Sequence, residues 1–151
     1  MKITFLDIDG VLNSGRFFAS PSRKDPLSKE ALDPSAVVLL NKLVEATGTK
    51  FVISSSWRLY VPWGRLSLWL SHHGFTGEVI GSTPELRDVD RGLEINEWLE
   101  AWDRNPHGED VESIVILDDD ADMNPHMSRL VQTTFEDGLT DADIARAIAL
   151  F

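Results

Sequence analysis

The chain has 151 residues, of which 42% are hydrophobic and 26% charged, and it contains no cysteine. These values are typical of a globular protein, and they exclude disulfide bonds and thiolate metal sites. The net charge of −11 argues against a general nucleic-acid coat. The first 66 residues nevertheless carry nine Lys and Arg against six Asp and Glu, so the N-terminal half can still receive an anionic substrate.

A chain of this length normally folds as one domain with a substantial core, so we expect a single domain over residues 1–151. No apolar run approaches the roughly 20 residues of a membrane span, which argues against a membrane partner. The N-terminal stretch MKITFLDIDG has the pattern of neither a signal peptide nor a transit peptide. Together with the lack of cysteine, this predicts a cytoplasmic protein.

The first half of the chain alternates strand-forming and helix-forming segments. An apolar run at 2–6 predicts a strand, and Gly10 permits a sharp turn after it. Residues 13–33 are polar and contain several serines, which predicts a loop or flap. A helix with cap residues at both ends follows over 34–47, and a second strand is predicted at 50–54.

The second half repeats this alternation. Apolar residues at 3–4 spacing and helix caps predict three further helices, and short apolar runs predict three further strands. In chain order these are a helix at 62–74, a strand at 78–81, a helix at 91–103, strands at 113–117 and 130–135, and a helix at 140–151. We expect Trp63 and Ile148 to face the core from the first and last of these helices.

Alternating strands and helices predict the fold class. Right-handed β-α-β units produce a mostly parallel sheet whose two faces are both covered by helices. We therefore expect an α/β protein with three α/β/α layers around a five-stranded, Rossmann-like sheet. In such folds, ligands bind beyond the carboxyl ends of the strands.

Acidic and hydroxyl side chains follow three of the predicted strands. The first strand ends in Asp7 and Asp9, the second in residues 54–56, which are all serine, and the strand at 113–117 is followed by four aspartates within residues 118–122. Two carboxylate clusters at one edge make an oxygen-rich site that suits Mg²⁺. The cation would let crowded carboxylates ionise, and it would offset their repulsion of a phosphate.

Four motifs at these positions resemble those of the haloacid dehalogenase (HAD) superfamily. They are DIDGVLN at 7–13, FVIS ending in Ser54, RGLEINEWL beginning at Arg91, and VILDDDAD at 115–122, and they occur in the family's order. More narrowly, ISSSWR at 53–58 and the last two motifs resemble small HAD domains associated with RNA-repair and phage-type proteins.

The resemblance implies catalytic roles for two aspartates. Asp7 would be the nucleophile that attacks phosphorus and forms an aspartyl-phosphate. Asp9 would protonate the leaving group and then activate water. In an extended strand, residues two apart point the same way, and the turn at Gly10 would aim both carboxylates at the substrate. Gly10 itself is a candidate substrate contact.

The resemblance also implies a Mg²⁺ site. Asp118 would be a direct ligand beside Asp7 and the Asp9 carbonyl, and either Asp119 or Asp122 would bind directly or through water. The presence of Asp120 in this cluster is equally well explained by a solvated side chain that does not bind the metal.

Phosphate binding would fall to serine and arginine side chains. Ser54 would hydrogen-bond the transferring phosphoryl group, with help from the Ser55 amide. Arg91 stands where the family more often has lysine, which keeps the charge and changes the donor geometry. Arg87 is a rival for this role, and both an ordinary cap role for Ser54 and a solvated role for Arg91 stay open.

The segment 56–63 interleaves aromatic and basic residues after the second strand. Trp57, Arg58 and Tyr60 could stack on a nucleobase or contact a polynucleotide backbone, although such aromatics are more often part of a core. The candidate contacts to an anionic substrate are Arg16, Arg23, Lys24 and Arg58.

The function expected from the resemblance is a Mg²⁺-dependent phosphomonoester hydrolase. The short connections predict a core without a cap domain, apart from the flap at 13–33, and this open site favours a nucleotide or a nucleic-acid end as substrate. No obligate protein partner is inferred. Two alternatives stay open: a receiver-like phosphoacceptor, which would need an aspartate that residues 78–83 lack, and a degenerate HAD fold that only binds.

Overall fold

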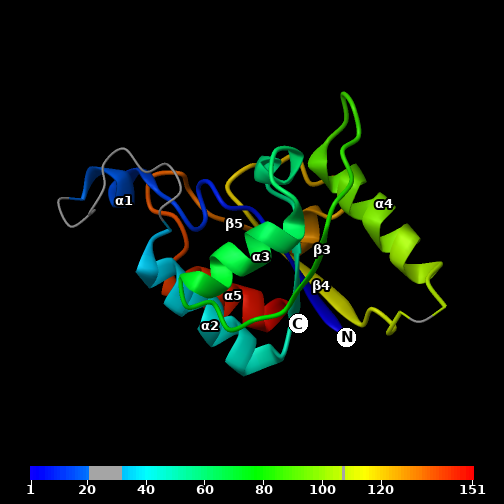
Figure 1. Ribbon diagram of the computed structural model, residues 1–151, viewed down its shortest axis with the longest axis horizontal. Coiled ribbons are helices and arrows are strands. Elements are labelled where there is room, and N and C mark those ends of the chain that lie inside the picture. Colours follow the sequence, from blue (N-terminus) through cyan, green and yellow to red (C-terminus); the bar gives the residue numbers. More distant parts are fainter. Residues whose placement is uncertain (21–31, 107) are drawn as a thin grey trace.

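The computed structural model describes residues 1–20, 32–106 and 108–151. Its centre is a five-stranded sheet flanked by helices (Figure 1). Every neighbouring pair of strands is parallel, and the strand order is β3-β2-β1-β4-β5. The strands are β1 Lys2–Leu6, β2 Lys50–Ile53, β3 Val79–Ser82, β4 Ser113–Asp118 and β5 Leu130–Gln132. The expected α/β, Rossmann-like sheet is confirmed, and it is wholly rather than mostly parallel.

Helices cover both faces of this sheet. The α-helices are α1 Gly15–Ala19, α2 Pro34–Thr47, α3 Trp63–His72, α4 Arg91–Asp103 and α5 Asp141–Leu150, and two 3₁₀ turns are η1 Ser56–Leu59 and η2 Met127–Arg129. Buried residues of α2, α3 and α5 form one core cluster with alternate strand residues, among them Leu6 and Ile53. Ile95 and Trp98 of α4 form a second cluster with the intervening strand residues, such as Phe5.

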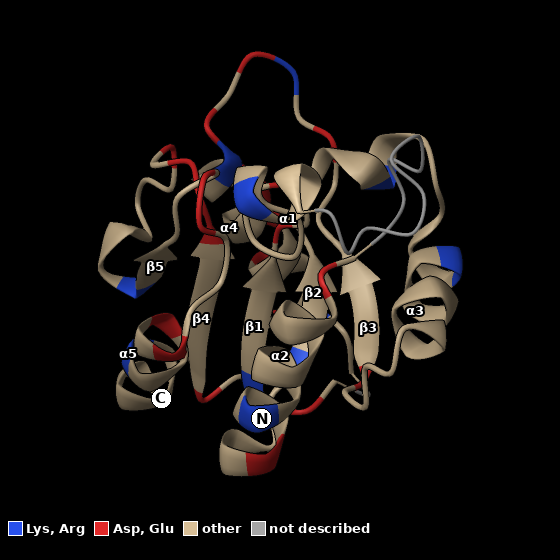
Figure 2. Ribbon diagram, turned by 90° about the vertical axis from the view of Figure 1, so that its left-hand side faces the viewer, with Lys and Arg blue, Asp and Glu red and all other residues tan. Residues whose placement is uncertain are grey.

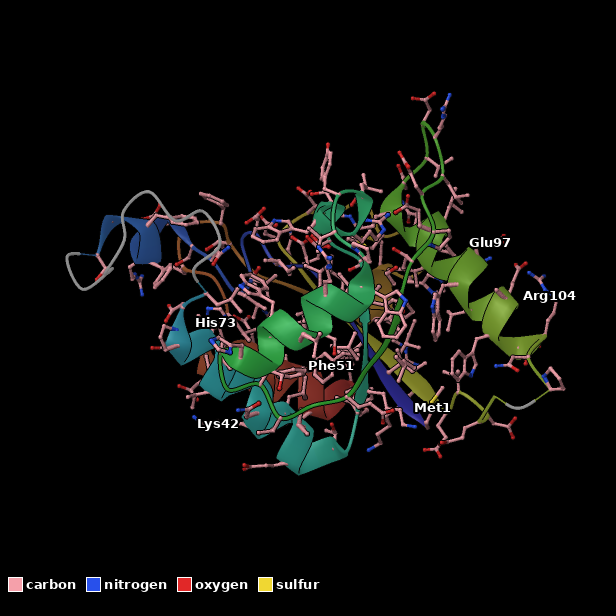
Figure 3. All side chains as sticks on the ribbon, in the orientation of Figure 1. Met1, Lys42, Phe51, His73, Glu97 and Arg104 are labelled. Carbon is pink, nitrogen blue, oxygen red and sulfur yellow. The ribbon has the colours of Figure 1, made fainter. Side chains whose placement is uncertain are left out.

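The core is made of large apolar side chains packed at close contact. Phe51 of β2 is fully buried, and its ring meets that of Phe75 edge-on, with 4.9 Å between centroids. Figure 3 shows Phe51 inside the molecule, whereas Glu97 and Arg104 project outward from α4. Strand residues that alternate between two buried faces explain why these runs are almost continuously apolar.

The helix limits follow the cap residues. The Asp33 side chain accepts a hydrogen bond from the Ser35 amide at the start of α2, and Gly48 ends that helix with φ +65°. Thr140 and Asp143 form the capping box that begins α5. These side chains satisfy backbone groups that a helix end would otherwise leave without partners.

Several local expectations were wrong. Trp63 is 43% exposed and Ile148 is 39% exposed, because α3 is buried through Leu66 and Leu70, and α5 through Ile144 and Ala147. The last strand ends at Gln132 rather than at residue 135, where the chain turns instead. The predicted flap begins with α1, and residues 21–31 of the flap lie outside the described residues.

Within the described ranges, no helix is long and apolar enough to cross a membrane.

Candidate active site

The strand register aligns four side chains across the carboxyl edge of the sheet. The amides of Asp7, Ser54 and Thr83 each donate to a carbonyl at the end of the neighbouring strand, which extends the ladders by one residue. In sheet order the row is Thr83, Ser54, Asp7 and Asp118. All four residues are at least 95% buried. Figure 2 shows acidic segments gathered just beyond the ends of β1 and β4.

Arg91 at the start of α4 reaches the carboxylates of this row. Its Nη1 atom lies 2.5 Å from Oδ2 of Asp118 and 3.5 Å from Oδ1 of Asp7, and its Nη2 atom lies 3.6 Å from Oδ2 of Asp120. Arg87, the rival predicted from sequence, is an exposed residue of the preceding loop. Of the two arginines, Arg91 is therefore the one that joins the site.

The Asp7 and Asp118 carboxyl groups are crowded. Burial, and next the charge of Asp118, raises the pKa of Asp7 from 3.8 to about 7, against the lowering effects of Arg91 and of hydrogen bonds from Ile8 and Ser55. Burial likewise raises the pKa of Asp118 to about 6, although Arg91 lowers it. One arginine therefore does not balance the negative charge here.

Three carboxylates converge closely enough to share a cation. Asp7, Asp118 and Asp119 each offer an oxygen, and the three oxygens lie within 4.8 Å of one another. Burial, and next the charge of Asp120, raises the pKa of Asp119. An all-oxygen donor set with uncompensated charge fits a hard divalent cation such as Mg²⁺.

Gly10 explains how Asp119 comes so close. The backbone of Gly10 has φ +75°, and a Cβ atom at this position would collide with the Asp119 carboxylate. Only glycine adopts that conformation without strain while leaving the space free. The structure confirms Gly10 as a turn residue with positive φ and shows that it makes room for a carboxylate of the cluster, whereas a substrate contact by Gly10 stays a prediction.

Asp122 has a different position from the one expected of a direct ligand. Its Oδ2 accepts a hydrogen bond from the Arg91 amide at 3.2 Å, and its carbonyl accepts one from the Gly92 amide at 3.0 Å. Its carboxylate thus holds the N-terminus of α4, and is not among the three converging carboxylates. A Cβ atom on Gly92 would collide with the backbone of Met123 and Asn124, so α4 approaches this loop as closely as glycine allows.

The Asp9 carboxylate also lies outside the cluster of three. Its Oδ1 accepts a hydrogen bond from Nδ2 of Asn13 at 3.2 Å, and its Oδ2 accepts one from Nε1 of Trp57 at 2.7 Å. Asn13 is fully buried, and the Trp57 ring stacks on Trp69. A metal contact through the Asp9 carbonyl stays a prediction, as does a contact of Trp57 with substrate.

Two hydroxyl groups of the row have no protein partner. The Ser54 and Thr83 side-chain oxygens are buried without a hydrogen bond. Buried polar groups are nearly always paired, so such groups at one edge indicate a place that a polar ligand completes. Ser54 was predicted, whereas Thr83 was missed, because a hydroxyl after an edge strand carries no distinctive pattern in the sequence.

The comparison with known families identifies this arrangement. A family model described as the HAD domain in Swiss Army Knife RNA repair proteins matches residues 3–144. The chain belongs to this family. No curated protein and no solved structure matches the chain. The match spans all four motifs, and HAD domains are generally hydrolases of the phosphatase type.

Arg58 of this HAD domain has a structural position rather than the predicted one at the substrate. Its side chain is 6% exposed and forms an ion pair with Glu94 of α4. Its remaining N–H groups donate to backbone carbonyls, which are those of Ser54, Ser55, Thr83 and Pro84. Every donor of the guanidinium is therefore used, and the prediction that Arg58 contacts substrate is wrong.

Glu94, the partner of Arg58, is a second residue near this edge that the sequence did not reveal. Its other oxygen accepts a hydrogen bond from the Leu86 amide at 2.9 Å. The Arg58–Glu94 pair thus ties together the turn after β2, the loop after β3 and α4, and Arg58 donates to the Ser54 carbonyl at 2.6 Å. A glutamate inside an amphipathic helix normally indicates a solvated face, so no signal in the sequence separated it from its neighbours.

The remaining predicted contacts within the described residues have exposed side chains. Arg16 in α1 forms an exposed ion pair with Asp137, and Tyr60 is 86% exposed. Arg23 and Lys24 lie outside the described residues. A substrate contact by Arg16 stays a prediction.

Proposed function

We propose that this HAD domain is a Mg²⁺-dependent phosphomonoester hydrolase that acts through an aspartyl-phosphate on Asp7. The observation that carries the proposal is the buried row of Ser54, Asp7 and Asp118, which Arg91 contacts from α4. The row and Arg91 together bring the proposed nucleophile Asp7, the unpaired Ser54 hydroxyl and the Arg91 guanidinium to one edge of the sheet. Few other reactions need this combination.

The reaction has two halves. In the first, an Asp7 oxygen bonds to phosphorus, the bond from phosphorus to the leaving oxygen breaks, and Asp9 gives its proton to that oxygen. In the second, Asp9 takes a proton from water, the water oxygen bonds to phosphorus, and the bond to Asp7 breaks. Phosphate is released, and Asp7 and Asp9 return to their starting states.

The phosphoryl group would be bound by residues on both sides of Asp7. The Ser54 hydroxyl and the Ser55 amide would donate to its oxygens, and Arg91 would balance its charge. Asp7, Asp118 and Asp119 would hold Mg²⁺, which supplies Lewis-acid stabilisation of phosphoryl charge when bound. Without it, three carboxylates would repel the substrate.

We propose a nucleotide or a nucleic-acid end as the substrate class. The description of the matching family model names RNA repair proteins. The short connections between elements also leave few residues for a cap that would enclose a small molecule. A phosphate at the end of a polynucleotide can enter an open edge. The balance of basic residues in the first 66 positions supports the same class.

Phosphate release tests this proposal. Purified protein would be assayed with and without Mg²⁺ on p-nitrophenyl phosphate, mononucleotides, and RNA and DNA oligonucleotides that carry a 5′- or a 3′-phosphate. Mg²⁺-dependent release that is fastest on an oligonucleotide end is the expected result. Absence of release on every substrate, with Mg²⁺ binding retained in calorimetry, would favour a phosphoacceptor or a binding module instead.

A further inference from the structure

The Asp9 carboxylate is held from two sides. Nε1 of Trp57 donates to Oδ2 at 2.7 Å, and Nδ2 of Asn13 donates to Oδ1 at 3.2 Å. Asn13 belongs to the segment after β1, whereas Trp57 lies in η1, after β2. The Asp9 side chain is therefore held by a residue of its own segment and by a residue of the turn after β2, both of which follow the carboxyl ends of their strands.

Trp57 is itself fixed in place. Its amide donates to the Ser55 hydroxyl at 3.3 Å, its carbonyl accepts from the Tyr60 and Val61 amides, and its ring stacks on Trp69 with 5.1 Å between centroids and 24° between planes. The ring also packs against the core cluster of α2, α3 and α5. The direction of its indole N–H is thus set by the backbone of η1 and by the stack.

We infer that Trp57 is a positioning residue that orients Asp9 toward the leaving oxygen of the substrate. The inference rests on the proposed function. Each carboxylate oxygen has two lone-pair directions, and Trp57 occupies one on Oδ2 while Asn13 occupies one on Oδ1. The remaining directions are then fixed in space, which is what proton transfer to one substrate atom requires.

An indole N–H is a donor only, so Trp57 cannot exchange the proton itself. Its effect passes through Asp9, which gives its proton to the leaving oxygen as the phosphorus–oxygen bond breaks and the bond to Asp7 forms. Trp57 therefore sets the orientation of the Asp9 carboxylate, and Asp9 transfers the proton.

The inference predicts a dependence on the leaving group. A ribose alkoxide is a poor leaving group and needs the proton from Asp9, whereas p-nitrophenolate is a stable anion and leaves with little assistance. The value of kcat/KM reports the steps up to the first irreversible one, so it reflects departure of the leaving group without the later hydrolysis that both substrates share. The informative quantity is the ratio of kcat/KM for a mononucleotide to that for p-nitrophenyl phosphate.

The test compares Trp57→Phe with Trp69→Phe. Trp57→Phe keeps an aromatic ring for the stack and removes the hydrogen bond to Asp9. Trp69→Phe alters the same stack and leaves that bond in place. We expect the ratio to fall at least about 10-fold in Trp57→Phe and to stay within about 3-fold of wild type in Trp69→Phe. Asp9→Asn sets the largest fall that the ratio can show, and circular dichroism checks that each variant folds.

Equal losses on both substrates in Trp57→Phe, matching those in Trp69→Phe, would overturn the positioning role while leaving the phosphatase proposal intact. An unchanged ratio in Asp9→Asn would show that the ratio does not report Asp9, and this would also overturn the inference. A wild-type protein that is inactive on both substrates would remove the proposed function, and the inference with it.

Discussion

The two halves of the carboxyl edge differ in how completely their charges are balanced. On the half that follows β1 and β4, Asp7, Asp118 and Asp119 converge, and Arg91 contacts two of them. On the half that follows β2 and β3, Arg58 pairs with Glu94 and uses every remaining N–H group on backbone carbonyls. The buried charges of the first half are negative in excess, whereas the buried pair of the second half is balanced.

This difference separates the half that we propose binds the cation from the half that holds the backbone around Ser54. Burial of like charges raises the pKa of Asp7 and of Asp118, so that half gains most from an added cation. The Arg58–Glu94 pair instead fixes the backbone that presents Ser54. Removing one member of a fully satisfied buried pair should therefore cost folding free energy, and changes in the first half should alter cation binding.

The largest effect on stability is expected from Glu94→Ala. It leaves the Arg58 guanidinium buried without its carboxylate and also removes the acceptor of the Leu86 amide. An uncompensated buried charge costs about 3–5 kcal/mol of unfolding free energy. Urea denaturation followed by circular dichroism measures the loss.

The matched control is Glu97→Ala, one turn further along α4. Glu97 pairs with Arg104 at 3.5 Å, but these side chains are 47% and 66% exposed. An exposed pair contributes about 0.2–1 kcal/mol. Similar losses in the two variants would contradict the supporting role of the Arg58–Glu94 pair.

A smaller loss of stability is expected from Gly10→Ala, in the half that we propose binds the cation. Left-handed backbone costs an alanine about 1–2 kcal/mol, and the new Cβ atom would displace the Asp119 carboxylate. We therefore expect weaker Mg²⁺ binding in calorimetry as well as a lower unfolding free energy.

Gly48→Ala separates the two effects. Gly48 also has positive φ, at +65°, but nothing lies within 4 Å of a Cβ atom built there. This variant should lose similar stability and keep its affinity for Mg²⁺. Unchanged Mg²⁺ affinity in Gly10→Ala would argue that Asp119 does not contribute to the site.

The pH dependence of stability should also differ with and without Mg²⁺. The folded-state pKa values of Asp7 and Asp118, about 7 and about 6, lie above their ordinary value of 3.8. Their contribution to stability is therefore fully present below pH 3.8 and is lost as pH rises through 6 and 7. In EDTA, the melting temperature of wild type should fall across this window more than that of Asp118→Asn.

Mg²⁺ binds the ionised carboxylates, so the rise in melting temperature that it causes should be larger at pH 8 than at pH 5. At ten times its dissociation constant, a ligand adds about 1.4 kcal/mol to the unfolding free energy. A Mg²⁺ effect that is equal at the two pH values would count against cation binding by these carboxylates.

The smallest effect is expected from Thr83→Val. The Thr83 hydroxyl is buried without a partner, so its replacement by a methyl group should change the unfolding free energy by less than about 0.5 kcal/mol or should stabilise the protein slightly. Thr133→Val is the contrast, because that hydroxyl donates to the Gly10 carbonyl at 2.7 Å, and its loss should cost about 1–2 kcal/mol. A large loss in Thr83→Val would mean that the hydroxyl has a partner in solution.

The sequence predicts the parts of the site that depend on strand order. Asp7, Ser54 and Asp118 each follow an apolar strand, and parallel strands bring their carboxyl ends to one edge, so their proximity follows from topology. Arg91 was identified through the motif resemblance, which places a basic residue near the start of this helix. The cap residues Asp33 and Thr140 were also predictable, because each forms its hydrogen bonds with residues two or three positions further along the chain.

Contacts between distant loops could not be predicted in this way. Arg58 looked like a substrate contact because its partner, Glu94, lies 36 residues further along, on another element. The bond from Trp57 to Asp9 spans 48 residues and depends on how η1 turns after β2. Asp122 fits the family motif for a metal ligand, but its use as a cap for α4 depends on where the loop meets that helix. Such pairings depend on three-dimensional packing, which a local pattern does not encode.

The most direct test of the account is phosphate release by wild type and by Asp7→Asn, each with and without Mg²⁺, on the best substrate found. Asparagine has nearly the same shape and cannot act as the nucleophile. We expect wild type to depend on Mg²⁺, and Asp7→Asn to lose at least about a thousand-fold in kcat while circular dichroism shows that its fold is retained. A rate in Asp7→Asn close to that of wild type would contradict the assignment of the crowded carboxylate half as the catalytic centre.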